Sequence, residues 1–431
     1  MPAAAPLQTS PARNANWLLA LLILVNVLNM VDRNLISSFG PQITADLNLT
    51  DTQFGYLTGL LFVFFYTVMG LFVGRLADTT HRPRLIAAGL ALWSLLTVVS
   101  GVAKNFLHIA VARMFIGVGE ACLSPASMSM LSDTYPQQSR GLAAGLYYLG
   151  LPLGAGASFI IAGVFGPTLG WRNCFYILGA LGLFLVPVML WLRDPPRGSF
   201  DAPQPEAQLA ANVRESLAQV WQVCRRSPAL AWAMIGAVFM HLPIGSAQFV
   251  QLWLVRERGF EASEIAITYG VLFIVFGIIG SLIGGVLGDW YQARFRGGRL
   301  RFFAIYLLVT TPLIISYRFV SPESPLFYIA MCVGFMNFMA FFGPVYATVQ
   351  DLAPAKLRGI TTAVLILMSN LIGLGLGAVA TGILSDVYNQ AGVVDPLTWS
   401  LLTVDTLAAF TIVSFFVGAH YWQKERDAIA G

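Results

Sequence analysis

The sequence predicts an all-α membrane protein in which twelve transmembrane helices form two pseudo-symmetric bundles of six. The chain of 431 residues is 57% hydrophobic and 11% charged, with a mean hydropathy of +0.72. Soluble domains carry about 25% charged residues, so the bilayer must be the solvent for most of this chain. Apolar runs of about 20 residues recur along it. Two short motifs also occur twice, at matching points of the pattern.

The same composition excludes several classes of function. A net charge of +4 is too small to indicate nucleic-acid binding, and the basic residues are spread over short loops. The four cysteines and four histidines show neither a disulfide framework nor metal-ligand spacing, so we expect no metal and no cofactor. The N-terminus has no basic segment followed by a short apolar run and a cleavage site. We therefore expect the first helix itself to direct insertion.

Apolar length and loop charge define the spans and their direction. Arg and Lys are enriched in cytoplasmic loops. One set of loops, together with both termini, holds 18 of the 25 basic residues, which predicts cytoplasmic termini. The opposite loops hold five, and Arg33 and Arg113 lie inside spans. The predicted spans are 16–38, 52–76, 83–103, 106–133, 140–165, 172–193, 229–255, 263–288, 300–319, 325–350, 358–386 and 397–422.

A long connection separates the two predicted bundles, 1–193 and 229–431. This linker, 194–228, begins with a Pro-rich stretch and continues with apolar residues at helical spacing from Leu209 to Cys224. Arg225 and Arg226 follow. Such a pattern is typical of an amphipathic helix that lies on the cytoplasmic membrane surface.

An internal repeat supports the division into two halves. Gly-x-Leu-x-Asp ends the second span at Asp78 and the eighth at Asp289, 211 residues later. A second motif begins with Asp, has Pro three residues later and continues to Arg-Gly; it starts at Asp133 and at Asp351, 218 residues apart. Two parallel six-helix repeats resemble the major facilitator superfamily, which implies halves that rock about a central cavity.

The repeated motifs also predict a cytoplasmic gate. Asp78 can accept hydrogen bonds from Arg140, and Asp289 with Arg358 would be the second copy. Arg82 and Arg84 follow the first motif, although Thr79, Thr80 and His81 replace its usual basic residue and glycine. The alternative interpretation is that these charges only set the topology.

Charges inside the first and fourth spans indicate a functional site. An ionised side chain at mid-bilayer costs about 2.5–3.5 kcal/mol, so it usually faces a polar cavity or another charge. Asp32 and Arg113 fall at similar depth, whereas Arg113 and Glu120 are about 10 Å apart along one helix face. We therefore expect Arg113 to pair with Asp32, leaving Glu120 as a carboxylate that can carry a proton. A permanent salt bridge that only orders the bundle is the alternative.

The polar residues of the two halves suggest an amphiphilic substrate. Asn26 and Asn29 share a face with Asp32 and Arg33 and extend the polar stripe. The second half offers amides, hydroxyls and aromatic rings instead. A cavity with one charged and one apolar wall would suit an anionic or zwitterionic head with a hydrocarbon tail. The second-half candidates for substrate binding are Gln248, Gln251, Tyr269, Asn337, Phe338, Ser369 and Asn370.

Span four reads Arg-Met-Phe-Ile-Gly-Val-Gly-Glu-Ala from Arg113, and span one contains Asp32-Arg33. These segments resemble the Spinster family of major facilitators, most closely in spans one, two and four, as in a bacterial homologue. The resemblance implies transport of lysophospholipids or sphingosine-1-phosphate driven by protons, with Asp32, Arg113 and Glu120 as the protonation-linked cluster and Arg33 near the substrate. It also implies a monomer in the bacterial inner membrane, with lysolipid, protons and membrane lipids as its partners.

Three other functions are weighed against this interpretation. A polyspecific drug/proton antiporter or a small organic-anion symporter of the same superfamily would also use Arg33 and Arg113. A lipid enzyme is disfavoured because the sequence has no Gly-x-Ser-x-Gly elbow, metal cluster or phosphate loop. A channel is disfavoured because the repeat implies alternating access.

Overall fold

The computed structural model describes residues 14–200, 213–354 and 357–430 of the chain. Every regular element in these ranges is a helix, which confirms the predicted all-α class. Contacts divide the chain into two compact units. The first unit combines Met1–Phe39 with Phe64–Leu209, and the second combines Gly40–Val63 with Ala210–Gly431. The predicted boundaries at 193 and 229 describe the sequence repeat, and they stay a prediction.

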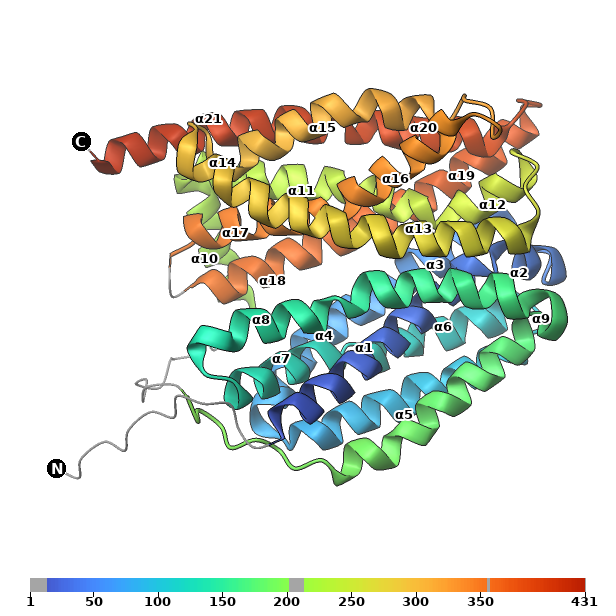
Figure 1. The fold of residues 1–431 in the computed structure, drawn as a ribbon, viewed down its shortest axis with the longest axis horizontal. Helices are drawn as coiled ribbons and strands as arrows, with labels where there is room; N and C mark the ends of the chain where they lie inside the picture. Colours follow the sequence, from blue (N-terminus) through green and yellow to red (C-terminus); the bar gives the residue numbers. More distant parts are fainter. Residues whose placement is uncertain (1–13, 201–212, 355–356, 431) are drawn as a thin grey trace. The chain divides into compact units, whose positions relative to one another are not determined.

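The first unit is built from long apolar helices (Figure 1). In it, α9 packs against α1 and α5, and α5 packs against α6. The first four residues of α4 belong to the second unit. Its helices are α1 (Ala15–Ser38), α4 (Leu60–Thr79), α5 (Arg82–Gly101), α6 (Phe106–Glu120), α7 (Leu123–Thr134), α8 (Gln137–Tyr148) and α9 (Gly150–Trp191).

The second unit contains the remaining helices, with two π-helical turns, η2 and η4, inside apolar segments. In it, α11 packs against α21 and η4, and α13 packs against α16. Its elements are α2 (Gly40–Asp46), α3 (Asp51–Thr58), α10 (Val213–Arg226), α11 (Pro228–Ser246), η1 (Ala247–Phe249), α12 (Val250–Arg256), α13 (Ala262–Leu282), η2 (Ile283–Leu287), α14 (Gly288–Arg294), α15 (Gly298–Ser316), α16 (Pro325–Ala340), α17 (Phe342–Leu352), α18 (Arg358–Met368), η4 (Ser369–Gly375), α19 (Leu376–Gln390), α20 (Pro396–Ala408) and α21 (Phe410–Ala430).

Eleven helical segments of the described ranges are long and apolar enough to cross a membrane. Ten correspond one to one with predicted spans, and the remaining segment, Gln137–Trp191, contains the predicted spans 140–165 and 172–193. A straight helix of 55 residues would be about 80 Å long, against a hydrocarbon core of about 30 Å. The chain instead turns back at Gly170, whose φ of 72° favours glycine (Figure 1). This segment therefore has room for two crossings.

Local sequence signals explain several helix starts. Ser227 accepts a hydrogen bond from the Leu230 amide and is followed by Pro228 at the first helical position. Ser324 and Pro325 repeat this arrangement at α16. These side chains satisfy amides that have no partner inside the helix, and proline has no amide to satisfy.

Close helix packing in both units depends on glycine. A Cβ on Gly154 of α9 would lie 2.4 Å from the Val27 carbonyl oxygen of α1. A Cβ on Gly245 of α11 would lie 2.1 Å from the carbonyl oxygen of Leu374. Small residues allow such approaches between membrane helices, where packing rather than the hydrophobic effect drives association.

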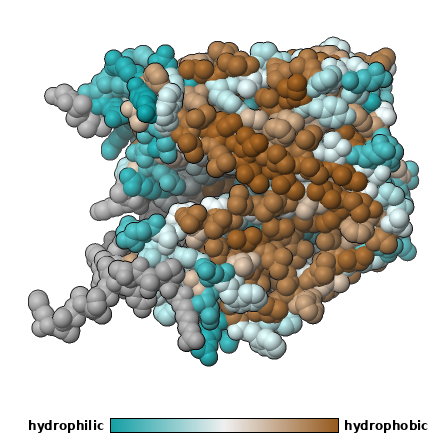
Figure 2. Space-filling model, in the orientation of Figure 1, coloured by the Kyte–Doolittle hydropathy of each residue, from teal (hydrophilic) through white to brown (hydrophobic). Residues whose placement is uncertain are grey.

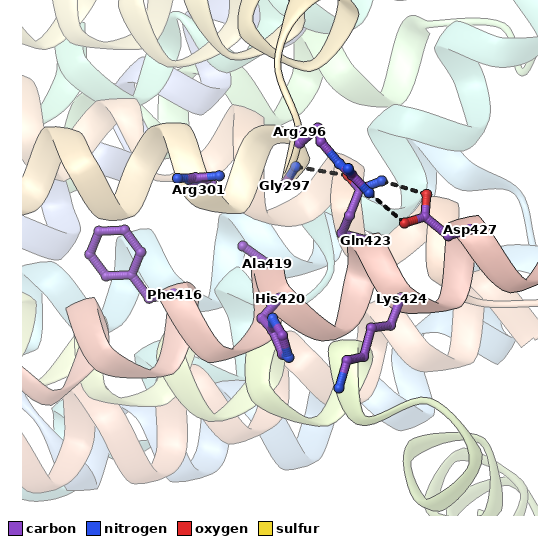
Figure 3. Close-up of a pocket in the computed structure, with 9 residues that line it drawn as sticks. All are labelled: Arg296, Gly297, Arg301, Phe416, Ala419, His420, Gln423, Lys424 and Asp427. Carbon is purple, nitrogen blue, oxygen red and sulfur yellow. Dashed lines mark hydrogen bonds and ion pairs between the residues drawn. The ribbon is translucent and has the colours of Figure 1, made fainter.

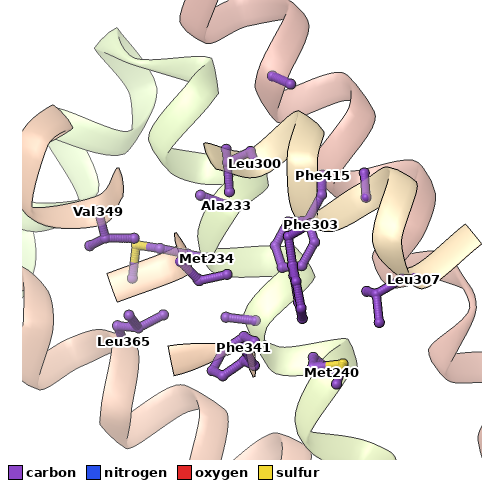
Figure 4. Packing of buried hydrophobic residues seen from close by; sticks show 14 of the residues in the cluster. Ala233, Met234, Met240, Leu300, Phe303, Leu307, Phe341, Val349, Leu365 and Phe415 are labelled. Atoms are coloured by element: carbon purple, nitrogen blue, oxygen red, sulfur yellow. The ribbon is translucent and has the colours of Figure 1, made fainter. Parts of the chain in front are cut away.

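Large apolar side chains fill the second unit (Figure 4). Phe303 of α15 lies 5.8 Å from Phe415 of α21 and 6.2 Å from Phe341, centroid to centroid. Met234 of α11 and Leu365 of α18 belong to the same buried cluster. Many other large apolar side chains face outward, and Figure 2 shows them as broad brown surfaces, as expected of helices solvated by lipid.

The linker helix forms as predicted in its second part, since α10 spans Val213–Arg226. Leu209 lies outside the described residues. Val220 is buried and Cys224 packs near Met234 of α11, whereas Trp221 and Leu217 are exposed. The helix therefore divides its apolar side chains between the protein and the outside.

Candidate functional site

The charged residues predicted in the first and fourth spans meet inside the first unit. Arg33 of α1 donates from Nε and Nη2 to Oε2 of Glu120 of α6, at 3.1 and 2.9 Å. Arg113, also of α6, donates to the backbone carbonyl oxygen of Arg33 at 2.7 Å. Asp32, Arg113 and Glu120 are each buried. Three of these four charges are thus held away from solvent by contacts between α1 and α6.

A third helix completes the cluster. Thr97 of α5 donates its hydroxyl to Oδ1 of Asp32 and also bonds the Trp93 carbonyl oxygen. The Arg33 guanidinium lies 4.5 Å from the centre of the Tyr66 ring of α4. Sequence reasoning missed both neighbours, because a threonine or tyrosine in an apolar helix gives no signal as a charge does.

The two carboxylates keep open acceptor positions. Oδ2 of Asp32 and Oε1 of Glu120 are buried, and neither has a hydrogen-bond partner among the described residues. Asp32 also interacts electrostatically with Glu120 and Arg113. A buried carboxylate oxygen without a donor is costly, and a proton would satisfy it. The cluster thus contains two neighbouring acids, each with one buried oxygen that is open to a further donor.

The pairing inside this cluster differs from the prediction. Arg33, which we expected to face substrate, is the partner of Glu120, which we expected to lack one. A fully buried carboxylate needs a counter-charge, and the long Arg33 side chain supplies it from the facing helix. The Arg33 side chain is still 28% exposed, so part of its guanidinium remains accessible.

Asn26 and Asn29 extend the buried polar face of α1. Asn26 donates to the Tyr147 carbonyl oxygen at 2.9 Å and so ties α1 to α8. Nδ2 of Asn29 is buried without a partner among the described residues. Asn29 is therefore the better placed of the two amides to meet a further group.

The second-unit candidates do not form one polar cluster. Gln251 donates to the Ala262 carbonyl oxygen at 3.1 Å, and Asn337 donates to the Thr310 hydroxyl at 2.8 Å. Ser369 begins the π-helical turn η4, followed by Asn370. Gln248 is half-buried near the end of α11. Gln251 and Asn337 thus link neighbouring helices.

Aromatic candidates of the second unit do gather. Tyr269 and Phe273 of α13 pack against Phe335 of α16 at 4.7 and 5.0 Å. Phe338 lies 5.9 Å from Phe273 and 6.0 Å from Phe342. These rings line one region between α13, α16 and α17.

A buried ion pair in the second unit was not predicted. Arg318 donates from Nε and Nη2 to Oδ2 of Asp405 at 3.1 and 3.0 Å, and both side chains are less than a tenth exposed. The guanidinium also lies 4.9 Å from the Trp253 ring centre. Arg318 lies at the end of the predicted span 300–319 and Asp405 lies inside the span 397–422, and the spacing within either span does not show that they pair.

The predicted gate of the first unit is organised around Arg82. This residue is fully buried; it forms an ion pair with Asp133 of α7 and donates to Asp194, the first linker residue, at 2.7 Å. Arg197 donates to the Ala77 and Thr80 carbonyl oxygens. Beginning at Asp194, residues 194–198 are therefore docked on this end of the unit.

Other gate candidates of this unit lie around that centre. Arg140 donates from Nε to the Tyr135 carbonyl oxygen at 3.1 Å. Asp78 and Arg84 are exposed at the adjoining ends of α4 and α5. Arg82 makes two ion pairs here, because the buried guanidinium requires counter-charges. The pairing of Asp78 with Arg140 stays a prediction.

The second unit contains the repeat counterpart of this arrangement. Arg299 donates to Asp289 at 2.6 Å and to Asp351 at 2.7 Å. The predicted partner of Asp289 was Arg358, which is exposed at the first residue of α18; the ion pair found for Asp289 is with Arg299 instead. Arg299 lies at the start of α15, as Arg82 lies at the start of α5, and its long side chain spans both carboxylates.

A helical membrane protein with a repeated charge arrangement and a buried cluster of acids and guanidiniums has the features of a secondary transporter. The model of the Major Facilitator Superfamily matches residues 22–378. The chain belongs to this superfamily.

The chain is similar to a number of relatives and solved structures. It is 29% identical to an MFS-type efflux pump of Mycolicibacterium smegmatis, over 87% of this chain and 85% of that one. It is 26% identical to Protein spinster of Drosophila melanogaster, over 72% and 52%. It is 24% identical to the hexuronate transporter of Escherichia coli K12, over 84% and 87%. An inward-facing bacterial homologue of the human lysosomal transporter Spinster has the same fold, with a TM-score of 0.83, 24% identity and coverage of 95% and 98%.

Proposed function

We propose that the protein is a proton-coupled secondary active transporter of amphiphilic lipids, such as a lysophospholipid or a sphingosine-1-phosphate-like molecule. The observation that carries this proposal is the buried cluster of Asp32, Arg33, Arg113 and Glu120 in the first unit. It contains two acids with open acceptor oxygens, and buried ionisable groups in transporters are typical of proton pathways.

In the proposed cycle, the Glu120 carboxylate and the anionic substrate compete for the same guanidinium. While Glu120 is ionised it holds Arg33 through two hydrogen bonds. Protonation of Glu120 removes the negative charge that holds Arg33. The partly exposed Arg33 then becomes available to an anionic headgroup, because charge-assisted pairs are the strongest that a guanidinium forms. Asp32 and Arg113 complete the switch.

The lipid class is supported by the second unit and by the relatives. Tyr269, Phe273, Phe335 and Phe338 offer aromatic surface that suits a hydrocarbon chain. The relatives include Protein spinster and a probable sphingolipid transporter of Arabidopsis thaliana, 29% identical over 41% of this chain. We propose Asn29, Gln248, Ser369 and Asn370 as polar contacts of the head.

A small organic anion is the second candidate substrate. The hexuronate transporter matches over 84% of the chain, and Arg33 with Arg113 would suit a sugar carboxylate. A drug exported in exchange for protons is the third candidate, and the MFS-type efflux pump among the relatives supports export in general. The buried aromatic region of the second unit favours the lipid over both.

The test is flux of a labelled lysophospholipid into proteoliposomes under an imposed pH gradient. We expect gradient-driven flux in the wild type and its loss in Glu120→Gln, with Glu264→Gln, an exposed carboxylate at the start of α13, as the control. If the lysophospholipid flux is the same with and without the pH gradient in the wild type and in both variants, proton coupling is rejected. No lysolipid flux, together with uptake of a hexuronate or export of a drug, would reject the lipid.

We further propose that the protein acts as a monomer in the bacterial inner membrane, with both termini in the cytoplasm. The excess of basic residues on the terminal side of the spans supports this orientation. A thiol-reactive, membrane-impermeant label should reach a cysteine introduced at the C-terminus only after inner-membrane vesicles are inverted. Labelling of this cysteine in intact spheroplasts would show that the C-terminus lies outside the cytoplasm and would contradict the proposed orientation.

A further inference from the structure

A cavity of about 460 Å³ lies in the second unit, between the start of α15 and the end of α21 (Figure 3). It is remote in sequence from every residue used in the proposed function. Its lining residues are Arg296, Gly297, Arg301, Phe416, Ala419, His420, Gln423, Lys424 and Asp427.

The cavity is basic. Arg296, Arg301 and Lys424 face a single acid, Asp427. That acid is already engaged, because Arg296 donates to it at 2.6 Å and Gln423 at 2.7 Å (Figure 3). Among the described residues, neither Arg301 nor Lys424 forms an ion pair. Arg301 and Lys424 are therefore two positive side chains of the cavity lining without an ion-pair partner in the part of the chain that the structure describes.

The lining also changes character along α21. Phe416, His420 and Lys424 are spaced four residues apart, so they form a stripe about 12 Å long on one face. Its first residue is an aromatic ring inside the predicted span 397–422, and its last is an ammonium group just beyond that span. Such a gradient matches a ligand with an apolar end and an anionic end.

The backbone turn at the edge of this cavity leaves room for the Arg301 side chain. Gly297 and Gly298 have φ values of 92° and 62°, which favour glycine. A Cβ on Gly297 would lie 2.7 Å from Cδ of Arg301. The turn is also fixed by the Gly297 amide, which donates to Gln423 at 3.0 Å. Glycine thus lets the Arg301 side chain lie over the turn at the edge of the cavity.

We propose that this cavity binds the phosphate headgroup of an anionic phospholipid from the surrounding bilayer. Arg301 and Lys424 contact the phosphate, and Phe416 contacts the first part of the acyl region. Basic cavities between membrane helices next to one bilayer surface are suited to anionic lipid heads. The site lies outside the proposed transport pathway and would serve a bound lipid rather than the transported one.

The test is lipid binding to the purified full-length protein in detergent, measured by native mass spectrometry. Phosphatidylglycerol should bind more tightly than phosphatidylcholine, and Arg301→Gln/Lys424→Gln should weaken phosphatidylglycerol binding by about tenfold or more. The matched control is Arg294→Gln/Arg426→Gln. It removes the same charge from residues that stack on Trp290 and Trp422 and do not line the cavity.

Two results would overturn the proposal. If both double variants bind phosphatidylglycerol equally weakly, the binding depends on the net charge of the protein and not on this cavity. Binding of inorganic phosphate that displaces phosphatidylglycerol at similar concentration would identify a soluble anion as the ligand. Thermal unfolding of each variant in lipid-free detergent shows whether the fold is intact. A Gly297→Ala variant, in which the new Cβ displaces the Arg301 side chain, should also bind phosphatidylglycerol more weakly.

Discussion

At the scale of single residues, the two units use buried charges in different ways. In the first unit, Arg33 and Glu120 form a pair in which an oxygen of Glu120 stays without a donor. In the second, Arg318 also donates two hydrogen bonds to Asp405, but the buried atom left without a partner is Nη1 of the arginine and not an oxygen of the acid. The first arrangement leaves room for a proton, whereas the second suits a fixed structural contact.

A structural role for Arg318 and Asp405 predicts a particular pattern of stabilities. Breaking a buried pair by removing one partner costs about 3–5 kcal/mol, because an uncompensated charge remains. Arg318→Met and Asp405→Leu should therefore each lower the thermal unfolding midpoint in detergent, whereas the double variant should recover most of the loss. If the double variant is stable but transport is lost, the pair has a role in transport instead.

Residue pairing was the part that sequence reasoning predicted least well. The participants Asp32, Arg113, Glu120, Asp289 and Arg82 were all named from the sequence. Their partners depend on how far a side chain reaches across to the next helix, and spacing along one helix does not contain that information. Arg299 shows the same limit, because only the structure brings it between two carboxylates.

At the scale of helices, glycine spacing explains how the first unit packs. Gly154 lies against α1, where a Cβ would also be 2.5 Å from Cβ of Met30. Gly145 of α8, by contrast, has no atom within 4 Å of the position of a Cβ. The same residue type therefore has a packing role at one position and none at the other.

This difference predicts opposite effects of one substitution. Gly154→Ala should destabilise the protein by about 1–3 kcal/mol, because overpacking forces the helices apart. Gly145→Ala should be neutral or stabilising by up to about 1 kcal/mol, because alanine is the better helix former. The thermal unfolding midpoints of both variants measure these changes in stability. Equal shifts of the two midpoints would show that α1 moves away from residue 154 at no cost.

The docked start of the linker is a second feature at this scale. Asp194 holds Arg82, whose side chain is fully buried, whereas Asp289 holds Arg299 with 68% of the Asp289 side chain exposed. We expect Asp194→Asn to cost about 1–3 kcal/mol, because a buried guanidinium loses a charged acceptor. Asp289→Asn should cost less than about 1 kcal/mol, because exposed pairs contribute little. Limited proteolysis in the linker provides a second measurement, with faster cleavage expected in Asp194→Asn only.

At the scale of the whole molecule, the sequence predicted the fold class and the repeat from hydropathy and two motifs. It did not show that residues 40–63, which precede the linker, associate with the second unit. The backbone amides of Asp51 and Thr52 donate to the Asp386 carboxylate of α19. The Asp51 carboxylate in turn forms an ion pair with Arg256 at 2.8 Å and accepts a hydrogen bond from the Ser385 hydroxyl at 2.7 Å. The helix dipole favours a carboxylate, here that of Asp386, at the start of α3. No sequence motif predicts that a partner 335 residues away would occupy this position.

This contact between α3 and α19 joins segments from the two repeats, so it must open if the carrier alternates access as proposed. Asp51→Cys/Ser385→Cys joined by a short thiol-reactive cross-linker, such as a bis-methanethiosulfonate, should therefore block substrate flux in proteoliposomes, and reduction of the two disulfides that it forms should restore flux. The native Cys122, Cys174 and Cys332 are buried, but Cys224 is only half-buried, so all variants carry Cys224→Ser. Each single cysteine variant treated with the same reagent is the control. Undiminished flux through the cross-linked protein would mean that α3 and α19 move together, and the opening would have to occur elsewhere.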